Sequence, residues 1–148
     1  TPEIFALMKS KGVALCATIA AGEAVSEYRG WKRNEPAPAR IIEKRKSFAA
    51  ALASGVTIVM GGDVGVYTHG DNAREMELMV DYGMKPLEVL RSATSINADV
   101  FGINDELGRI RPGLLADIIA VEGNPAVSIS AIRKIVLVMK DGVIYHDT

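Results

Sequence analysis

The first two thirds of the chain alternate between helical repeats of apolar residues and short runs that are apolar nearly throughout. Helices are predicted where apolar residues recur every three or four positions between start and stop residues, at 1–12, 39–54, 71–83 and 86–96, with a short helical turn at 95–102. The runs 13–19 and 56–60 lack polar alternation, which is typical of strands covered on both faces. The stretch 22–38, which contains glycine, glutamate and proline, predicts a loop.

The pattern changes after Gly108, where short strands and tight turns replace the helices. Strands are predicted at 116–121 and 135–139. Asp141-Gly142 predicts a two-residue hairpin turn, because both residues tolerate a left-handed backbone. We therefore expect an α/β part, residues 1–105, followed by a small all-β part, residues 106–148.

The two apolar strands of the first part cannot form a stable sheet alone, because a parallel sheet needs its faces and edges covered. Helices that alternate with such strands favour a parallel sheet with helical crossovers, and a (β/α)8 barrel takes roughly 250 residues. We interpret residues 1–105 as the last two strand–helix units of such a barrel. A missing N-terminal part of the barrel, or a complementary chain, is expected to complete it.

Composition narrows the classes of partner. The 148 residues carry a formal net charge of −1 and are 49% hydrophobic, so nucleic acid is not expected as a partner, and no apolar run is long enough to cross a membrane. No signal peptide is recognised, and the chain opens at Thr1 without a methionine, so we expect a chain processed or cut from a longer one. The single cysteine, Cys16, fits a reducing, cytoplasmic compartment and is predicted to be a buried structural thiol. A homo-oligomer is also expected.

Asp63 is the strongest candidate for chemistry, because it follows the apolar run 56–60 in a glycine-rich loop. Barrel enzymes place catalytic groups at the carboxyl ends of their strands. A carboxylate there can bind a divalent cation and accept a proton from a metal-bound water. An aspartate among glycines is also common in turns, so a local turn or capping role stays open. The spacing of the glycines argues against a phosphate-binding loop.

The chain has two histidines. Three roles remain open for His69, which lies in the polar loop after Asp63: a hydrogen bond to nearby backbone, a contact with the substrate or, least of all, a metal ligand. His146 lies in the all-β part and is not expected to take part. Because a metallohydrolase site normally needs three or more protein ligands, we do not expect the chain alone to be a competent enzyme.

Four stretches carry a family resemblance: 55–66 with the following His69-Gly70-Asp71-Asn72-Ala73-Arg74-Glu75, then 93–98, 108–117 and 139–142. In this order they resemble the amidohydrolase superfamily, and within it the imidazolonepropionase-like branch that includes Xaa-Pro dipeptidases (prolidases). The resemblance covers essentially the whole chain, and the combination of motifs is specific where a single motif is not.

This resemblance implies strands seven and eight of an amidohydrolase barrel with their helices, followed by the C-terminal strands of a composite β-sandwich domain. It implies that Asp63 is the strand-eight aspartate, which ligates a metal and passes a proton from the bridging hydroxide to the leaving amine. One or two zinc ions are implied for the complete enzyme, with the remaining ligands upstream, so that this chain alone need not hold metal. Tyr67 and His69 are implied as substrate-binding residues.

The implied reaction is hydrolysis of an amide bond in a small-molecule substrate, an Xaa-Pro-type dipeptide or a cyclic amide, by metal-activated hydroxide. The alternative is a non-catalytic fragment or subunit that packs with a complementary chain. Two stretches depart from the family pattern: Cys16-Ala17-Thr18, where relatives tend to have Pro-Thr, and Ala20-Ala21-Gly22-Glu23. Both are expected at the mouth of strand seven, where they bear on substrate specificity.

Overall fold

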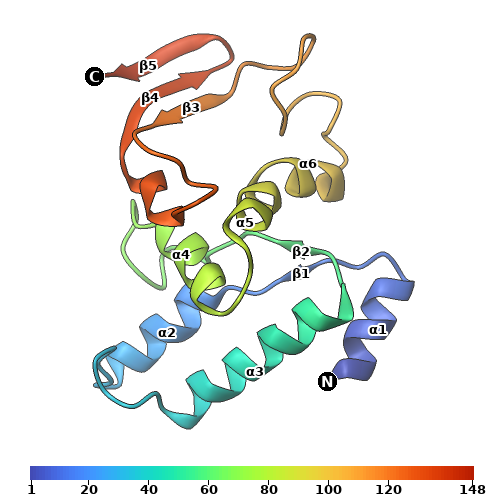
Figure 1. Ribbon diagram of the computed structural model, residues 1–148, viewed down its shortest axis with the longest axis vertical. Coiled ribbons are helices and arrows are strands. Elements are labelled where there is room, and N and C mark those ends of the chain that lie inside the picture. Colours follow the sequence, from blue (N-terminus) through green and yellow to red (C-terminus); the bar gives the residue numbers. More distant parts are fainter. The chain divides into compact units, whose positions relative to one another are not determined.

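The computed structural model describes residues 1–148, which form two compact units, Thr1–Met84 and Lys85–Thr148 (Figure 1). The first unit contains α1 (Pro2–Ser10), β1 (Leu15–Cys16), α2 (Ile19–Tyr28), α3 (Ala39–Ser54), β2 (Ile58–Val59) and α4 (Ala73–Asp81). The second contains α5 (Pro86–Ala93), α6 (Ser95–Phe101), β3 (Ile118–Val121), the 3-10 helix η1 (Ile129–Arg133), β4 (Ile135–Lys140) and β5 (Val143–Asp147). None of the helices combines the length and the apolar character that a membrane span requires. The boundary expected near residue 105 is of a different kind, because it divides the α/β part of the chain from the all-β part. It stays a prediction.

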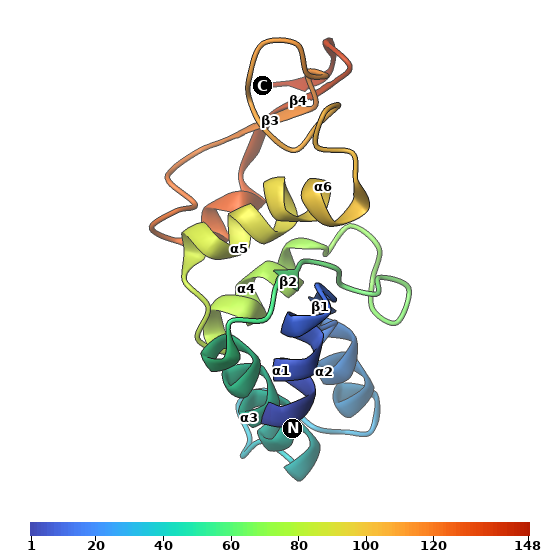
Figure 2. The same ribbon diagram turned by 90° about the vertical axis from the view of Figure 1, so that its right-hand side faces the viewer.

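The first unit is built on a parallel pair of short strands. Leu15 of β1 pairs with Ile58 of β2, and Cys16 pairs with Val59. In Figures 1 and 2 the helices α1, α2 and α3 lie on one side of this pair. Helices that join and cover parallel strands make the fold α/β, as the alternating pattern predicts. A closed barrel remains part of the proposal below.

Helix α3 has the bounds that the sequence predicts. It begins after Pro38 and ends at Gly55, whose φ of 68° supplies the left-handed stop. The apolar side of α3 is buried in the unit, with Phe48 3% exposed. The Phe48 ring meets the ring of Tyr82 edge to face, with centroids 6.1 Å apart. This contact anchors α3 to the end of α4.

Three predictions for the region before α3 are wrong. The predicted strand 13–19 is ordered as a strand only at Leu15–Cys16, and α2 occupies the first part of the predicted loop 22–38. The chain leaves the strand direction at Thr18, which has a φ of 45°, and Ile19 begins the helix. Cys16 is exposed rather than buried, whereas both residues of the equally short β2 are buried.

In the second unit α5 packs against α6, and β3, β4 and β5 form an antiparallel sheet in that order. The predicted hairpin is confirmed between β4 and β5, where Asp141 and Gly142 have φ values of 49° and 75°. Asp117 fastens this turn: its carboxylate accepts hydrogen bonds from Lys140 Nζ at 2.6 Å and from the backbone N–H of Asp141 at 2.8 Å. The hairpin is therefore held by both turn chemistry and an ion pair.

Candidate functional site

Asp63 lies in the loop that leaves the carboxyl end of β2, whose two residues are both buried. Its backbone is left-handed, with a φ of 56°, and its carbonyl oxygen accepts the N–H of Val66 at 3.3 Å. The local turn considered from the sequence is therefore present at Asp63, and it is formed by a backbone hydrogen bond rather than by the side chain. The carboxylate is exposed and takes no hydrogen bond or ion pair within the chain, so it is available to an external group.

The carboxyl end of β1 lies beside the same loop, because parallel strands end at one edge. Cys16 Sγ approaches the carbonyl oxygen of Gly61 to 3.7 Å. Desolvation of this sulfur, followed by the negative charge of Glu75, raises the pKa of the Cys16 thiol. A thiol with a raised pKa stays protonated at neutral pH and is a poor nucleophile or metal ligand. This agrees with the sequence-based view that Cys16 is not a nucleophile.

Tyr67 is buried, with 4% of its surface exposed, and its hydroxyl has no hydrogen-bond partner in the chain. The hydroxyl lies against Gly62, so close that a Cβ at that position would collide with it. The Arg74 guanidinium lies over the Tyr67 ring, 5.6 Å from the ring centroid. Desolvation first, and then the charge of Glu75, raises the pKa of Tyr67. A substrate contact of Tyr67 stays a prediction.

His69 is exposed and lies near the turn that carries Asp63. Its Nε2 is 3.8 Å from the position that a Cβ on Gly65 would take. The loop between them is tied down by Tyr28 of α2, whose hydroxyl donates to the carbonyl of Val66 at 2.8 Å. The three residues proposed from the sequence thus share one loop, and no side-chain hydrogen bond joins them. The substrate contact predicted for His69 also remains untested.

Glu75 is a residue that the sequence analysis did not single out. It is 1% exposed, and its carboxylate accepts the N–H of Ile19 at 3.0 Å and the N–H of Ala20 at 2.7 Å. A signal for it exists in the sequence: Glu75 shares a helical face with Met79 and Tyr82, at i, i+4 and i+7, and both of these are buried. A glutamate on an inward face indicates a specific partner.

No group of three or more histidine, cysteine, aspartate or glutamate side chains comes together in the chain. A divalent cation bound by nitrogen or oxygen donors needs about three protein ligands. The exposed carboxylate of Asp63 suits one such ligand. The donor set of these 148 residues therefore fits one part of a metal site, and the other donors would have to come from other polypeptide.

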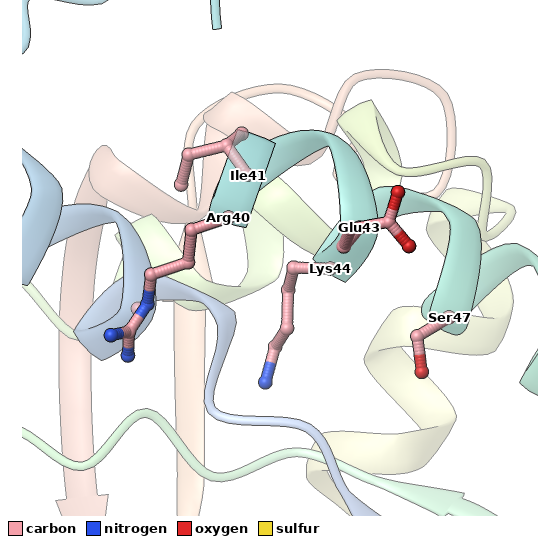
Figure 3. A pocket seen from close by; sticks show the side chains of 6 residues that line it. Arg40, Ile41, Glu43, Lys44 and Ser47 are labelled. Carbon is pink, nitrogen blue, oxygen red and sulfur yellow. The ribbon is translucent and has the colours of Figure 1, made fainter. Parts of the chain in front are cut away.

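A surface pocket of about 270 Å³ lies between α2 and α3 (Figure 3). Its lining is Gly22, Arg40, Ile41, Glu43, Lys44 and Ser47. The Lys44 ammonium is engaged, because it donates to the carbonyl oxygen of Ala17. None of the residues proposed for chemistry lines this pocket, so it is separate from the Asp63 loop.

The sequence model of the Amidohydrolase family matches residues 3–145. Ochratoxinase from Aspergillus niger is 32% identical over 138 residues, which cover 89% of this chain and 28% of that protein. A solved Xaa-Pro dipeptidase with methionine bound in its active site superposes with a TM-score of 0.85 at 38% identity, covering 97% of this chain and 37% of that one. The crystal structure of the A. niger ochratoxinase gives a TM-score of 0.81 at 29% identity, covering 99% and 35%.

The chain therefore spans only about a third of the length of the proteins it is similar to. The family match nevertheless covers nearly all of its residues, and the relatives include a dipeptidase and an ochratoxinase. The chain belongs to the amidohydrolase family and resembles its prolidase-like branch.

Proposed function

We propose that this chain is the C-terminal part of a metal-dependent amidohydrolase that cleaves an amide bond in an Xaa-Pro-type dipeptide or a cyclic amide. The observation that carries the proposal is the Asp63 carboxylate, exposed and unpaired at the end of a buried parallel strand. The dipeptide class comes from the solved Xaa-Pro dipeptidase, at 38% identity over 97% of this chain.

In this proposal Asp63 has two roles. Its carboxylate holds a divalent cation as one of several ligands, and zinc is the expected ion. When bound, such a cation supplies Lewis-acid chemistry that activates water and polarises the amide carbonyl. Asp63 then accepts the proton of the attacking water and delivers it to the leaving nitrogen, which must be protonated before it departs as an amine. The lack of a local partner leaves the carboxylate free for this transfer.

Tyr67 and His69 are the residues of the same loop that we propose to meet the substrate. His69 is exposed beside the Asp63 turn, and its imidazole can donate a hydrogen bond to a substrate carbonyl or carboxylate. The Tyr67 hydroxyl is buried against Gly62 without a partner. A bound substrate or ordered water that reaches it would satisfy this donor.

Other polypeptide would complete the site. β1 and β2 pair only with each other, although parallel strands are normally covered on both edges. We propose that further strands flank this pair, and that they bring the remaining metal ligands to the edge where Asp63 lies. The ends of β1 and β2 then form part of the mouth of a barrel.

Hydrolysis assays on the complete protein test this proposal. With the dipeptide Met-Pro as substrate, release of free proline is expected, with loss of activity on treatment with a metal chelator and recovery on addition of Zn²⁺. A protein that releases no proline from Met-Pro or from other Xaa-Pro dipeptides, and opens no cyclic amide, would rule out the proposed reaction. Activity that persists after the chelator has removed all bound metal would rule out its metal dependence.

The alternative is a non-catalytic chain that acts by packing with a complementary chain. Apolar side chains of the first unit favour a covering partner, because Ile4, Leu7 and Val13 are each at least 50% exposed. An experiment that mixes this chain with a co-purifying polypeptide distinguishes the packing role from the enzymatic one. A stable complex with neither bound zinc nor amidase activity favours the packing role, whereas activity that appears only in the mixture favours the shared active site.

A further inference from the structure

We propose that Glu75 is a positioning residue for the hydrolysis, because its side chain joins the loop after β1 to the loop after β2 and so holds Asp63 in place. This inference rests on the proposed role of Asp63. We do not propose that Glu75 touches the substrate or the metal. It acts through the backbone that follows β1 and the backbone that follows β2.

On the β1 side, the Glu75 carboxylate binds the start of α2. One oxygen accepts the N–H of Ile19 at 3.0 Å and the other accepts the N–H of Ala20 at 2.7 Å. These two residues are the first of the helix, whose early N–H groups have no partner within it. Thr18, which precedes them, makes no side-chain capping bond. A carboxylate from α4 therefore performs the capping that the local sequence does not provide.

On the β2 side, the stem of the same side chain packs against Gly62. A Cβ on Gly62 would lie 3.4 Å from Glu75 Cβ, and it would collide with the Tyr67 hydroxyl. Two buried side chains, those of Glu75 and Tyr67, thus lie close to the Gly62 backbone. The next residue is Asp63, a non-glycine residue with a φ of 56°. Aspartate is one of the few non-glycine residues that tolerate this conformation, so the loop can turn at Asp63 directly after the packed Gly62.

The charge of Glu75 points to a role beyond packing. An apolar side chain on this face of α4 would fill the same space without the cost of burying a carboxylate. Burial is the largest influence on Glu75 and raises its pKa, whereas the two backbone hydrogen bonds and then the charge of Lys44 lower it. Lys44 itself binds the carbonyl of Ala17. The carboxylate and the ammonium therefore hold the segment that follows β1, the carboxylate through the N–H groups of Ile19 and Ala20 and the ammonium through the C=O of Ala17.

The test compares Glu75→Gln with Glu43→Gln in the complete protein, with Met-Pro as substrate and saturating Zn²⁺. Glutamine keeps the shape of Glu75 but presents an NH₂ group to one of the two N–H donors. Because a shift of about 1 Å at a reacting group can cost roughly 10²-fold in rate, kcat should fall about 10- to 100-fold with KM within about twofold. Glu43 is on the exposed surface of α3 with a side chain 70% exposed, so its variant should keep the parent kcat.

A second readout follows the backbone directly. Amide hydrogen exchange at Ile19 and Ala20 should accelerate at least about tenfold in Glu75→Gln, and remain unchanged in Glu43→Gln. If Glu75→Gln does not fold, Glu75→Asp, which keeps the charge but is one methylene shorter, takes its place with the same expected loss of kcat. A role in stability alone would lower the melting temperature and leave kcat per folded molecule at the parent value, and this result would overturn the proposal.

The Asp63→Asn variant separates this inference from the proposed function. Loss of turnover in Asp63→Asn together with an unchanged kcat in Glu75→Gln would refute only the positioning role. Full turnover in Asp63→Asn would refute the proposed function, and the role of Glu75 with it. Losses in both variants, with the smaller loss in Glu75→Gln, are the expected outcome.

Discussion

Replacing Gly62 with alanine should destabilise the first unit through one identifiable contact. The new Cβ would lie closer to the Tyr67 hydroxyl than the 3.0 Å that real Cβ atoms respect, and ordinary contact begins at 3.4 Å. The tyrosine cannot swing away freely, because it is 4% exposed. Overpacking of this kind costs about 1–3 kcal/mol, and we expect Gly62→Ala to lose about 2 kcal/mol of unfolding free energy.

Removal of the hydroxyl should relieve the clash. The ring carbon that bears the hydroxyl lies 3.4 Å from the position that an alanine methyl group would take at Gly62, which a phenylalanine ring tolerates with little movement. Tyr67→Phe alone also removes a buried hydroxyl without a partner, so it should be neutral or stabilising by up to about 1 kcal/mol. In the double variant the two changes should couple favourably by about 1–2 kcal/mol.

Urea unfolding of the complete protein, followed by circular dichroism, measures each change as a shift in midpoint at constant slope. Gly22→Ala is the matched control, because Gly22 lies inside α2 and no atom is within 4 Å of the position that its new Cβ would take. There alanine should stabilise by roughly 0.5–1 kcal/mol. Additive effects of Gly62→Ala and Tyr67→Phe would show that the hydroxyl does not lie against Gly62, and would refute the reasoning.

Three further predictions concern other parts of the chain. A hydrogen bond from Lys140 is the main cause that lowers the pKa of Asp117 below its ordinary value of 3.8. The Asp117 carboxylate therefore contributes to stability above pH 3.8, and this contribution disappears as the pH falls through the lowered pKa. The urea midpoints of the parent and Asp117→Asn should differ near neutral pH and converge in acid, and a constant difference would contradict this. Tyr82→Phe removes a 3.0 Å hydrogen bond to the buried Glu23 carboxylate and should cost roughly 1.5–3 kcal/mol in thermal unfolding, whereas an unchanged melting temperature would show that the bond adds nothing. Gly142→Val places a branched side chain at a φ of 75° and should destabilise the β4–β5 hairpin by about 1–2 kcal/mol. Amide hydrogen exchange in β5 should therefore be faster than in the parent, and an unchanged exchange rate would count against this prediction.

The elements that the sequence predicts well have their boundary signals within a few residues. Pro38 and Gly55 bracket α3, and the Asp141-Gly142 pair defines the hairpin without help from distant residues. The α/β class follows from the two apolar runs, which pair in parallel. The position of Asp63 after a buried strand is predicted for the same local reason, because the apolar run and the glycine-rich loop adjoin in sequence.

Helix α2 could not be predicted from its own sequence, because its start depends on tertiary structure. An apolar run continues unbroken from the strand into the helix, and Thr18 shows no capping bond. The cap comes from Glu75, more than fifty residues later in the chain. The prediction that Cys16 is buried is wrong, because an apolar run indicates burial only where other elements cover both faces of the strand, and Cys16 lies on an uncovered face of β1.

The turnover of Asp63→Asn in the complete protein tests the central claim most directly. The asparagine would keep the size of the side chain and lose its charge and most of its basicity, so kcat for Met-Pro should fall roughly 10²- to 10⁴-fold, with the melting temperature near that of the parent. Asp81→Asn, at an exposed aspartate at the end of α4, should keep the parent kcat. Equal kcat values for Asp63→Asn and Asp81→Asn would contradict the account.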